Sequence, residues 1–351
     1  MKITFVLPFV NLTGGIRVML HYANWLHDAG HHVTVVYPTW PYRFHWTQRE
    51  RWREFRKQRA SAVAVPWMNV NCELLRAPLI RSRFLPRADV VIATAWPTAN
   101  DVARLAESCG RKVHVVMHHE QGTGSERRIR ANYRHPFYRI TLSRYVGQQL
   151  REQFGCAVDD VVPAAVDTRT FFRDGEREPN SVLLLYHPDP RKGGEDSIKA
   201  LERLRARIPD VNLRVAGTVW PSGTWPKWLP FDFHPDDASI RRAYSASTAF
   251  LYPSRYEGFG LPPLEAMACG CPVVTTATGA VGEYCSDRRN ALVVRAGDVD
   301  AMVDGLAEII NDPLLQVQLI TAAYRTAECY RVDRIAPMFA AALERAVNAT
   351  N

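Results

Sequence analysis

The sequence lacks the features of a membrane-spanning or disulfide-bonded protein. It has no run of about 18 apolar residues, so we expect no membrane-spanning helix. Its seven cysteines are odd in number and form no C-x-x-C pair, which favours a reduced, cytoplasmic compartment and argues against a zinc site. The first residues, MKITFVLPFV, carry one lysine before a short apolar run and no small-residue cleavage site. We therefore expect a first β-strand there and not a signal peptide.

A dinucleotide-binding fingerprint is also absent. The glycine pair Gly14-Gly15 follows a strand-like run and opens a helix-like one, but the local sequence LTGGIR does not have the G-x-G-x-x-G spacing. This argues against a nicotinamide-dependent dehydrogenase. A glycine loop between a strand and a helix still brings backbone N–H groups close to an anion. Gly15 is therefore a candidate neighbour of a phosphate group.

Short apolar runs alternate with helix-like segments along the chain, whose 351 residues are a natural length for two domains. Strand-like runs include KITFVLPF and HHVTVVYP in the first half and SVLLLYHP and TAFLYPS in the second. This alternation predicts an α/β fold with two Rossmann-like domains, each built on a mostly parallel sheet. The break falls in a polar stretch at 161–181, so we expect domains at 1–165 and 166–330. The last segment, 331–351, predicts a helix that packs back on one half, with the N-terminal domain as the expected partner.

Positive charge is concentrated in the first half of the chain. Residues 1–165 contain 23 Lys and Arg against 12 Asp and Glu, a net charge of +11, whereas the remainder contains 21 against 24, a net charge of −3. Such a surface suits anionic lipid head groups, acidic glycans or nucleic acid, and a solvated helix face is the alternative. No nucleic-acid-binding motif accompanies the charge, so we expect contact with an anionic membrane surface and not with nucleic acid. The stretches 45–59 and 126–139 interleave arginines with aromatic residues, among them Trp46, Trp52, Phe55, Tyr133 and Phe137.

The most informative stretch, residues 255–276, reads RYEGFGLPPLEAMACGCPVVTT. Pro262 and Pro263 fit the first turn of a helix, because a missing N–H is tolerated there. The preceding glycine loop then points its amides and the positive end of the helix dipole at an anion. Glu257 in the loop and Glu265 in the first helical turn would accept hydrogen bonds from hydroxyl groups that flank a phosphate. The stretch therefore predicts a nucleotide-sugar site, and a purely structural glycine loop is the alternative.

This stretch resembles family 4 of the retaining GT-B glycosyltransferases, whose signature holds two glutamates with seven residues between them (E-x7-E). Residues 257–274 read EGFGLPPLEAMACGCPVV and follow that signature closely. The resemblance implies the GT-B fold, in which two Rossmann-like domains face each other across a cleft. It implies that Glu257 contacts hydroxyls of the transferred sugar and that Glu265 holds the ribose. The implied ligands of the distal phosphate are the amides of Gly258, Phe259, Gly260 and Leu261.

Further segments resemble the same family. RKGGEDSIKAL resembles the stretch whose lysine neutralises the diphosphate, which implies that role for Lys192. The family usually carries an arginine where His187 stands, so the resemblance leaves open whether His187 or Arg191 supplies that positive charge. The glycines at 14–15 resemble the loop beside the diphosphate and acceptor. Two departures are Ala280, which replaces a glycine, and the alanines at 164–165, which replace Asn-Gly.

Two adjacent histidines follow the apolar run KVHVVM. At this strand end the family places a histidine or aspartate near the C6 hydroxyl of the sugar and the reaction centre. His118 matches by spacing better than His119, and which of the two faces the site stays open. A structural hydrogen bond is the alternative role for either ring.

Taken with the resemblance, these features predict a retaining glycosyltransferase. It would move a sugar from a nucleotide-diphosphate sugar to a hydroxyl acceptor in glycan, polysaccharide or glycolipid biosynthesis. His118 and Glu257 are the expected catalytic residues. The expected donor-binding residues are Gly15, His187, Arg191, Lys192, Gly258, Phe259, Gly260, Leu261 and Glu265.

No cofactor and no metal is expected, because no Asp-x-Asp pair follows directly on a strand-like run. We expect a cytoplasmic enzyme that associates peripherally with the inner face of a membrane. A nucleotide-sugar epimerase or hydrolase and a non-catalytic nucleotide-sugar-binding protein are the rival interpretations. The sequence does not distinguish the donor sugar, the base or the acceptor.

Overall fold

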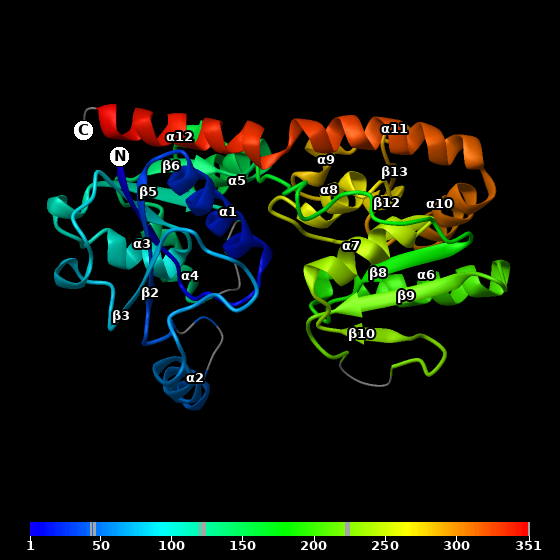
Figure 1. The fold of residues 1–351 in the computed structure, drawn as a ribbon, viewed down its shortest axis with the longest axis horizontal. Helices are drawn as coiled ribbons and strands as arrows, with labels where there is room; N and C mark the ends of the chain where they lie inside the picture. Colours follow the sequence, from blue (N-terminus) through cyan, green and yellow to red (C-terminus); the bar gives the residue numbers. More distant parts are fainter. Residues whose placement is uncertain (43, 45–46, 119, 121–123, 222–224, 350–351) are drawn as a thin grey trace. The chain divides into compact units, whose positions relative to one another are not determined.

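The computed structural model describes residues 1–349 except residues 43, 45–46, 119, 121–123 and 222–224. The chain folds into two compact units. The first unit comprises Met1–Ala164 together with Val332–Asn351, and the second comprises Ala165–Arg331. The chain therefore passes between the units twice, and both of its ends belong to the first unit (Figure 1).

The first unit is built on a seven-stranded sheet in the order β3-β2-β1-β4-β5-β6-β7. All strand pairs in it are parallel. Most of the strands read as unbroken apolar runs, as expected where helices cover both faces of a sheet. The strands are β1 (Lys2–Val6), β2 (His32–Pro38), β3 (Glu73–Ala77), β4 (Val90–Ala93), β5 (Arg111–Val116), β6 (Tyr138–Thr141) and β7 (Asp160–Val161).

The C-terminal helix completes the core of the first unit. The ring of Phe339 in this helix stacks on Tyr22 with 4.7 Å between ring centroids and lies 6.2 Å from the ring of Phe5. Figure 1 shows it running beside the first helix, and the contacts agree. The helices of this unit are α1 (Gly14–Asp28), α2 (Gln48–Ala60), α3 (Trp96–Val102), α4 (Glu126–Asn132), α5 (Arg144–Phe154) and α12 (Val332–Asn348).

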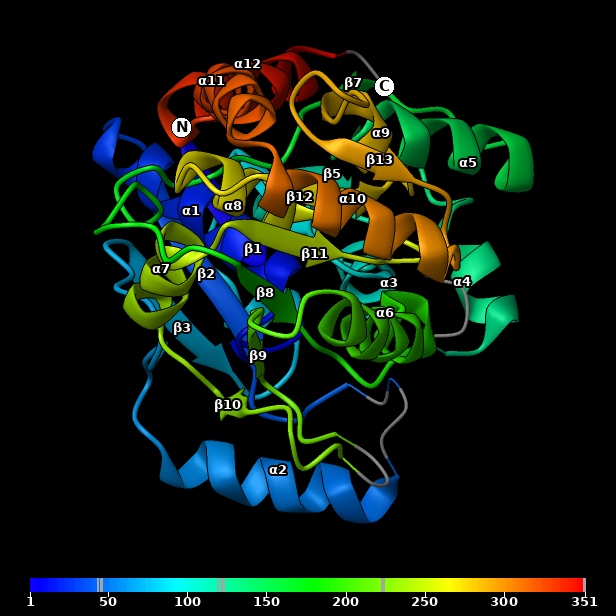
Figure 2. The same ribbon diagram turned by 90° about the vertical axis from the view of Figure 1, so that its right-hand side faces the viewer.

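Helix α2 differs from the other helices of this unit because none of its residues is buried. It connects β2 with β3, and Figures 1 and 2 show it set apart from both strands. The Thr47 hydroxyl caps its first turn in a reciprocal box with Glu50, which stabilises an otherwise exposed helix. The helix therefore carries its basic and aromatic residues on the surface of the first unit.

The second basic stretch, 126–139, does not form the exposed aromatic surface that the sequence suggested. Tyr133 and Phe137 are only 5% and 6% exposed and belong to the core of the first unit. The expectation was wrong for these two rings because they pack into hydrophobic clusters, and the spacing of the arginines does not indicate such tertiary contacts. Trp46, in the first basic stretch, lies outside the described residues.

The second unit has a six-stranded sheet in the order β10-β9-β8-β11-β12-β13, again with parallel pairs throughout. The strands are β8 (Ser181–Leu185), β9 (Asn212–Gly217), β10 (Phe231–Phe233), β11 (Ala249–Tyr252), β12 (Val273–Thr276) and β13 (Leu292–Val294). The helices are α6 (Gly194–Arg207), α7 (Asp237–Ala246), α8 (Leu261–Ala268), α9 (Val281–Tyr284), α10 (Val299–Asn311) and α11 (Pro313–Cys329).

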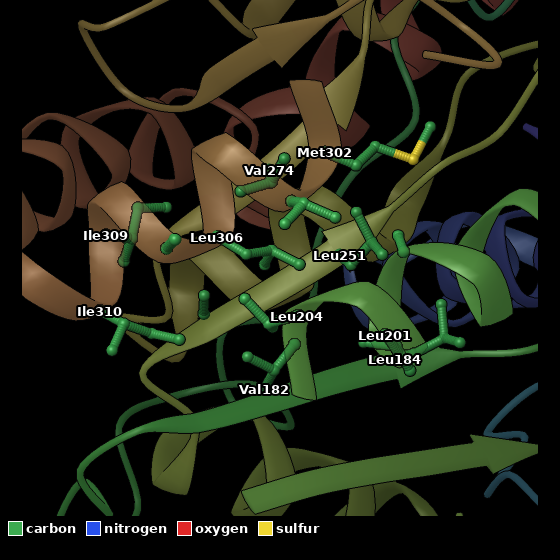
Figure 3. Packing of buried hydrophobic residues seen from close by; sticks show 14 of the residues in the cluster. Val182, Leu184, Leu201, Leu204, Leu251, Val274, Met302, Leu306, Ile309 and Ile310 are labelled. Atoms are coloured by element: carbon green, nitrogen blue, oxygen red, sulfur yellow. The ribbon is translucent and has the colours of Figure 1, made fainter. Parts of the chain in front are cut away.

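The core of the second unit lies between one face of this sheet and the helices α6 and α10 (Figure 3). Apolar side chains at helical spacing on both helices meet the alternate residues of β8, β11 and β12 that point to that face. The labelled core residues are Val182, Leu184, Leu201, Leu204, Leu251, Val274, Met302, Leu306, Ile309 and Ile310.

Two parallel sheets flanked by helices confirm the predicted α/β fold class. Because the strands of each sheet are parallel, their carboxyl ends meet at one edge, where ligands bind in open α/β sheets. In the second unit the loops after β8, β11 and β12 leave the sheet at that edge. Within the described part of the chain, no helix is both long and apolar enough to cross a membrane.

Candidate active site

Glu257 lies at the centre of the candidate site in the second unit. Its side chain is 8% exposed, and its Oε1 atom accepts three hydrogen bonds. The donors are Nζ of Lys192 at 2.7 Å, the hydroxyl of Tyr252 at 2.5 Å and the hydroxyl of Ser254 at 2.7 Å. Lys192 comes from the loop after β8, whereas the other three residues come from β11 and the turn after it. The carboxylate is thus fixed before any ligand arrives.

The backbone of this turn rests on the neighbouring loop. The carbonyl oxygen of Arg191 accepts hydrogen bonds from the backbone N–H groups of Arg255 at 2.7 Å and Tyr256 at 3.1 Å. Gly193 adopts a φ of +67°, and a Cβ there would lie 2.1 Å from the carbonyl oxygen of Pro253. The loops after β8 and β11 therefore approach too closely for a side chain at this position, which fixes the spacing between Lys192 and Glu257.

A third loop closes on the same turn. Gly279, after β12, has a φ of +59°, and a Cβ on it would lie 1.8 Å from the carbonyl oxygen of Glu257. Only glycine fits such an approach in the left-handed region. The neighbouring Ala280, which departs from the family pattern, is fully buried. Position 279 therefore requires glycine for a structural reason, the close approach of the loop after β12 to Glu257.

The glycine loop leads into α8 as the sequence predicted. Gly260 precedes the helix in the left-handed conformation, with a φ of +83°, and Pro262 and Pro263 lie in the first turn. The hydroxyl of Tyr284 donates to the carbonyl of Gly260, and the ring of Phe259 stacks on that of Tyr284 with 5.6 Å between centroids. Phe259 and Leu261 are buried, so their side chains are not available to a ligand.

Glu265 lies deeper in α8 than the sequence suggested. The helix begins at Leu261, so Glu265 belongs to its second turn and the first turn carries no acidic residue. The expectation of a first-turn position was wrong because Leu261 already has helical geometry ahead of the two prolines. Glu265 is 9% exposed, and its Oε2 atom accepts a hydrogen bond of 3.4 Å from Tyr244. Burial, and next the nearby Glu265, hold the pKa of Tyr244 well above its ordinary value.

The loop after β8 gathers His187, Asp189 and Arg191. The carboxylate of Asp189 accepts from Nε of Arg191 at 3.0 Å and from Nη2 at 2.6 Å. The Arg191 side chain lowers the pKa of Asp189 to about 2, so the carboxylate is ionised at neutral pH. The Nδ1 atom of His187 accepts from the backbone N–H of Asp189 at 3.0 Å. Burial, followed by the charge of Lys192, lowers the pKa of His187, which keeps the ring neutral.

The three predicted diphosphate ligands are therefore together, but each is engaged with the protein. The Arg191 guanidinium is held by Asp189, the Lys192 ammonium by Glu257, and the His187 ring is neutral. Sequence reasoning missed the partners Asp189, Tyr252 and Ser254. For the two hydroxyl residues, the available signal was the segment YPSRY directly before Glu257, since a buried carboxylate needs hydrogen-bond donors.

In the first unit, the candidate residue Gly15 lies beside Met117, the neighbour of the candidate residue His118. His118 follows β5 and is half-buried. Gly15 stands in the first turn of α1, and a Cβ there would lie 2.8 Å from Sδ of Met117, the residue before His118. Thr13 caps that helix by accepting from the N–H of Ile16. His119 lies outside the described residues.

A buried carboxyl group that sequence reasoning missed lies two residues after His118. Glu120 is 6% exposed, and its Oε1 atom accepts from the backbone N–H of Trp96 at 3.0 Å, at the start of α3. Burial raises the pKa of Glu120 to about 8. The same Trp96 side chain fills the space beside Gly124, where a Cβ would come within 2.5 Å of the indole. The segment after β5 is thus attached to the start of α3 at two points.

Acidic residues that suggest a metal site have other partners. The Asp-x-Asp pair of the sequence, Asp298 and Asp300, lies at the start of α10. There Asp298 accepts from the N–H of Ala301, and Asp300 pairs with Arg203. Over the residues that the structure describes, no group of three or more His, Cys, Asp or Glu side chains is arranged to hold a metal ion.

Comparison with known proteins is consistent with this geometry. Residues 167–326, which include all the loops around Glu257, match the family model described as glycosyl transferases group 1. The chain is 26% identical over 348 residues to a phosphatidyl-myo-inositol mannosyltransferase of Mycolicibacterium smegmatis. That alignment covers 92% of this chain and 88% of the relative.

Solved structures of low sequence identity share the fold. Sucrose-phosphate synthase from Thermosynechococcus elongatus superimposes with a TM-score of 0.75 at 18% identity and covers 99% of this chain and 100% of its own. Anabaena HepE, solved in complex with UDP and glucose, gives a TM-score of 0.75 at 16% identity, with 98% and 99% covered. The fold is GT-B, and the chain is a glycosyltransferase, as the sequence predicted.

Proposed function

We propose that this GT-B glycosyltransferase belongs to family 4 and transfers a sugar from a nucleotide-diphosphate sugar to a hydroxyl acceptor with retention of configuration and without a metal ion. The observation that carries the proposal is the Lys192–Glu257 pair, held at the carboxyl edge of the second sheet beside the glycine loop that opens α8. A cation, a fixed carboxylate and a helix N-terminus meet there. These are the groups that a diphosphate linked to a sugar requires.

The diphosphate would bind to the amides of residues 258–261 and to Lys192. Pro262 and Pro263 have no N–H, so the donors of this helix start come from the loop ahead of them. Lys192 is 39% exposed and its flexible stem allows the ammonium to turn from Glu257 to a phosphate. Arg191, which is 48% exposed, would add positive potential nearby while its pair with Asp189 holds it in place. Gly15 of the first unit is the further proposed neighbour of the phosphates.

Two carboxylates would bind the sugars on either side of the diphosphate. Glu257 would accept hydrogen bonds from hydroxyls of the transferred sugar, and Glu265 would accept them from the ribose. Both are less than a tenth exposed, and a buried carboxylate discriminates strongly for a ligand that hydrogen-bonds to it. His118 would orient the sugar near its C6 hydroxyl. His187, which is neutral, would contribute a hydrogen bond and not a charge.

The reaction then follows from the distribution of charge. Cleavage of the sugar–phosphate bond leaves positive charge on the sugar ring and negative charge on the departing diphosphate. Lys192, the loop amides and the α8 dipole would stabilise the leaving group, which is the main electrostatic requirement of the step. The departing phosphate would accept the proton of the incoming hydroxyl, so retention needs no separate base. Because these groups already stabilise the leaving diphosphate, we propose that the reaction needs no metal.

We further propose that the acceptor lies at an anionic membrane surface, on which the enzyme is held peripherally from the cytoplasmic side. Helix α2 supports this, since its arginines and Lys57 surround Trp52, which is 53% exposed. Trp52 forms an edge-to-face cluster with Trp40 and Phe55, at 4.9 and 5.7 Å between centroids. Basic residues around exposed aromatic rings are typical of helices that lie on lipid head groups. The relative from Mycolicibacterium smegmatis is named for a lipid acceptor, phosphatidyl-myo-inositol.

The products formed with and without acceptor test the proposal. The enzyme would be incubated with UDP-, GDP- and ADP-sugars alone, and again with vesicles that contain phosphatidylinositol or with a panel of simple glycosides. A transferase releases nucleotide diphosphate rapidly only when an acceptor is present, and the new linkage keeps the configuration of the donor. A hydrolase consumes the donor by itself, an epimerase converts it to an equilibrium mixture with its epimer, and a binding protein leaves it intact. Any of these results would overturn the proposed transfer.

A further inference from the structure

Three donors share one oxygen of Glu257, and they are not equivalent. The hydroxyls of Tyr252 and Ser254 belong to residues that are 7% and 1% exposed, whereas the Lys192 side chain is 39% exposed. Tyr252 is the last residue of β11, so its backbone is fixed by the sheet. The Ser254 hydroxyl makes its shortest contact, 2.7 Å, with Glu257 and also lies 3.2 Å from the carbonyl oxygen of Arg191. Two donors are therefore buried, and the third, the ammonium of Lys192, is partly exposed on a long side chain.

A bound diphosphate would compete for the exposed donor, Lys192. The ammonium of Lys192 carries a single positive charge, and a diphosphate presents more negative charge than one carboxylate. When Lys192 turns to the phosphates, Glu257 loses its counter-ion although it is 8% exposed. A carboxylate in such a position is stable only if other hydrogen bonds compensate the lost solvation. The hydroxyls of Tyr252 and Ser254 are already in place to supply them.

We infer that Tyr252 and Ser254 are positioning residues, which hold the Glu257 side chain toward the transferred sugar while Lys192 leaves it for the diphosphate of the donor. The inference rests on the proposed function of this site and adds an exchange of partners to it. In the ligand-free state Lys192 and Glu257 neutralise each other. In the donor complex the lysine pairs with the diphosphate, and the hydroxyls of Tyr252 and Ser254 alone hold Oε1 of Glu257 in place.

Removing one hydroxyl tests this role. Tyr252→Phe deletes only the donor to Glu257, so the variant should bind UDP, GDP or ADP within about twofold of wild type. Its kcat with the preferred donor should fall about ten- to hundredfold, the range expected for a lost hydrogen bond to a charged group. The KM for the donor should change much less, because the contact to the sugar matters most in the transition state. Ser254→Ala should show the same pattern.

Tyr324→Phe is the matched control. Tyr324 lies on α11 in the same unit, with its hydroxyl near Gly270 and not at Glu257. It should leave both kcat and KM unchanged. If Tyr252→Phe and Ser254→Ala keep wild-type kcat, or if they lose kcat only in proportion to a general loss of thermal stability, the inference is wrong.

A crystal structure with bound nucleotide diphosphate gives the second test. We expect Nζ of Lys192 more than about 4 Å from Glu257, which is beyond the limit of an ion pair, with Tyr252 and Ser254 still in hydrogen-bond contact. If the nucleotide binds and Lys192 stays on Glu257, the exchange is refuted although the proposed function stands. If no nucleotide diphosphate or nucleotide sugar binds to wild type, it is the proposed function that fails.

Discussion

The Nζ atom of Lys192 lies 2.7 Å from the Oε1 atom of Glu257, so the two side chains neutralise each other in this structure. In the proposed donor complex they bind different parts of one ligand, the lysine the diphosphate and the glutamate the sugar. The pair joins the loop after β8 to the turn after β11. Its members are unequal, since Lys192 is 39% and Glu257 8% exposed. A ligand that attracts the lysine can therefore open the pair, whereas the glutamate stays where the backbone holds it.

The two glutamates should differ in their effects on nucleotide binding. Glu265→Ala should weaken binding of the nucleotide diphosphate by about 1–3 kcal/mol, the scale of a lost hydrogen bond to a charged group. Glu257→Ala should leave that affinity unchanged or raise it, because Lys192 loses its competitor, and it should cut turnover. Isothermal titration calorimetry with UDP, GDP and ADP measures the affinities of the two variants, and an activity assay measures their turnover. The assignment of the site is wrong if both variants bind like wild type and turn over like wild type.

Gly279 should be intolerant of a side chain. Gly279→Ala introduces a Cβ 1.8 Å from the carbonyl oxygen of Glu257 at a φ of +59°, so the turn has to move. We expect a loss of about 2 kcal/mol or more in the free energy of unfolding. Gly282→Ala is the control, because its Cβ meets nothing closer than 3.7 Å and it lies in a helix. Chemical denaturation measures the free energy of unfolding of the two variants. Equal values would contradict the close approach of Gly279 to the carbonyl oxygen of Glu257.

Stability should depend on pH through Glu120. Its pKa is about 8 in the folded protein, above the ordinary value of 4.5, so the folded state binds the proton more tightly than the unfolded chain. The stability that the protonated carboxyl provides is complete below pH 4.5 and is lost as the pH rises through about 8. Glu120→Gln has no proton to lose and keeps a carbonyl for the N–H of Trp96.

Relative to wild type, Glu120→Gln should therefore become more stable as the pH rises from 5 to 9, by up to about 4 kcal/mol. Urea denaturation at a series of pH values measures the difference. A difference that stays constant over this range would show that Glu120 is ionised in the folded protein at neutral pH.

Helix α2 should govern binding to anionic lipid. Reversal of its exposed charges with Arg49→Glu, Arg53→Glu, Arg56→Glu and Lys57→Glu should abolish co-sedimentation with anionic vesicles. Each basic residue contributes about 1 kcal/mol near such a surface, and salt screens the contribution. Arg51 is left intact because its guanidinium lies over the Trp40 ring at 5.0 Å and supports the aromatic cluster. The variant should bind nucleotide normally, and neutral vesicles are the control.

If the wild-type protein does not bind anionic vesicles at low salt, the membrane proposal is contradicted. The acceptor would then be sought among soluble or growing glycans. The proposed donor site in the second unit would be unaffected by that result.

The fold and the frame of the site were largely predictable from local patterns. Alternating apolar runs predicted parallel sheets, and the prolines after Gly260 predicted the start of α8 to within one residue. Both signals are local, because strand burial and the tolerance for proline depend on a few neighbouring residues. The resemblance added the glutamates and the lysine.

The partners of individual side chains were not predictable. Nothing in the sequence indicates that Lys192 turns to Glu257, because this pairing depends on how two loops that are distant in the sequence approach each other. The pairing of Arg191 with Asp189 depends on the conformation of the single loop that carries both residues. The burial of Tyr133 and Phe137 is also a property of tertiary packing. Arginines around an aromatic residue look alike in a sequence whether the ring is exposed, like Trp52, or lies in the core.

The most direct test of the account is the thermal unfolding midpoint of wild type and of Lys192→Ala with UDP, GDP and ADP in excess chelator. A ligand that binds the native state raises the midpoint. We predict that at least one nucleotide diphosphate does so for wild type without metal, that the shift is much smaller for Lys192→Ala, and that the corresponding nucleoside gives little shift with either protein. The account is contradicted if none of the three raises the midpoint of wild type, if the shift requires added Mg²⁺ or Mn²⁺, or if Lys192→Ala responds as wild type does.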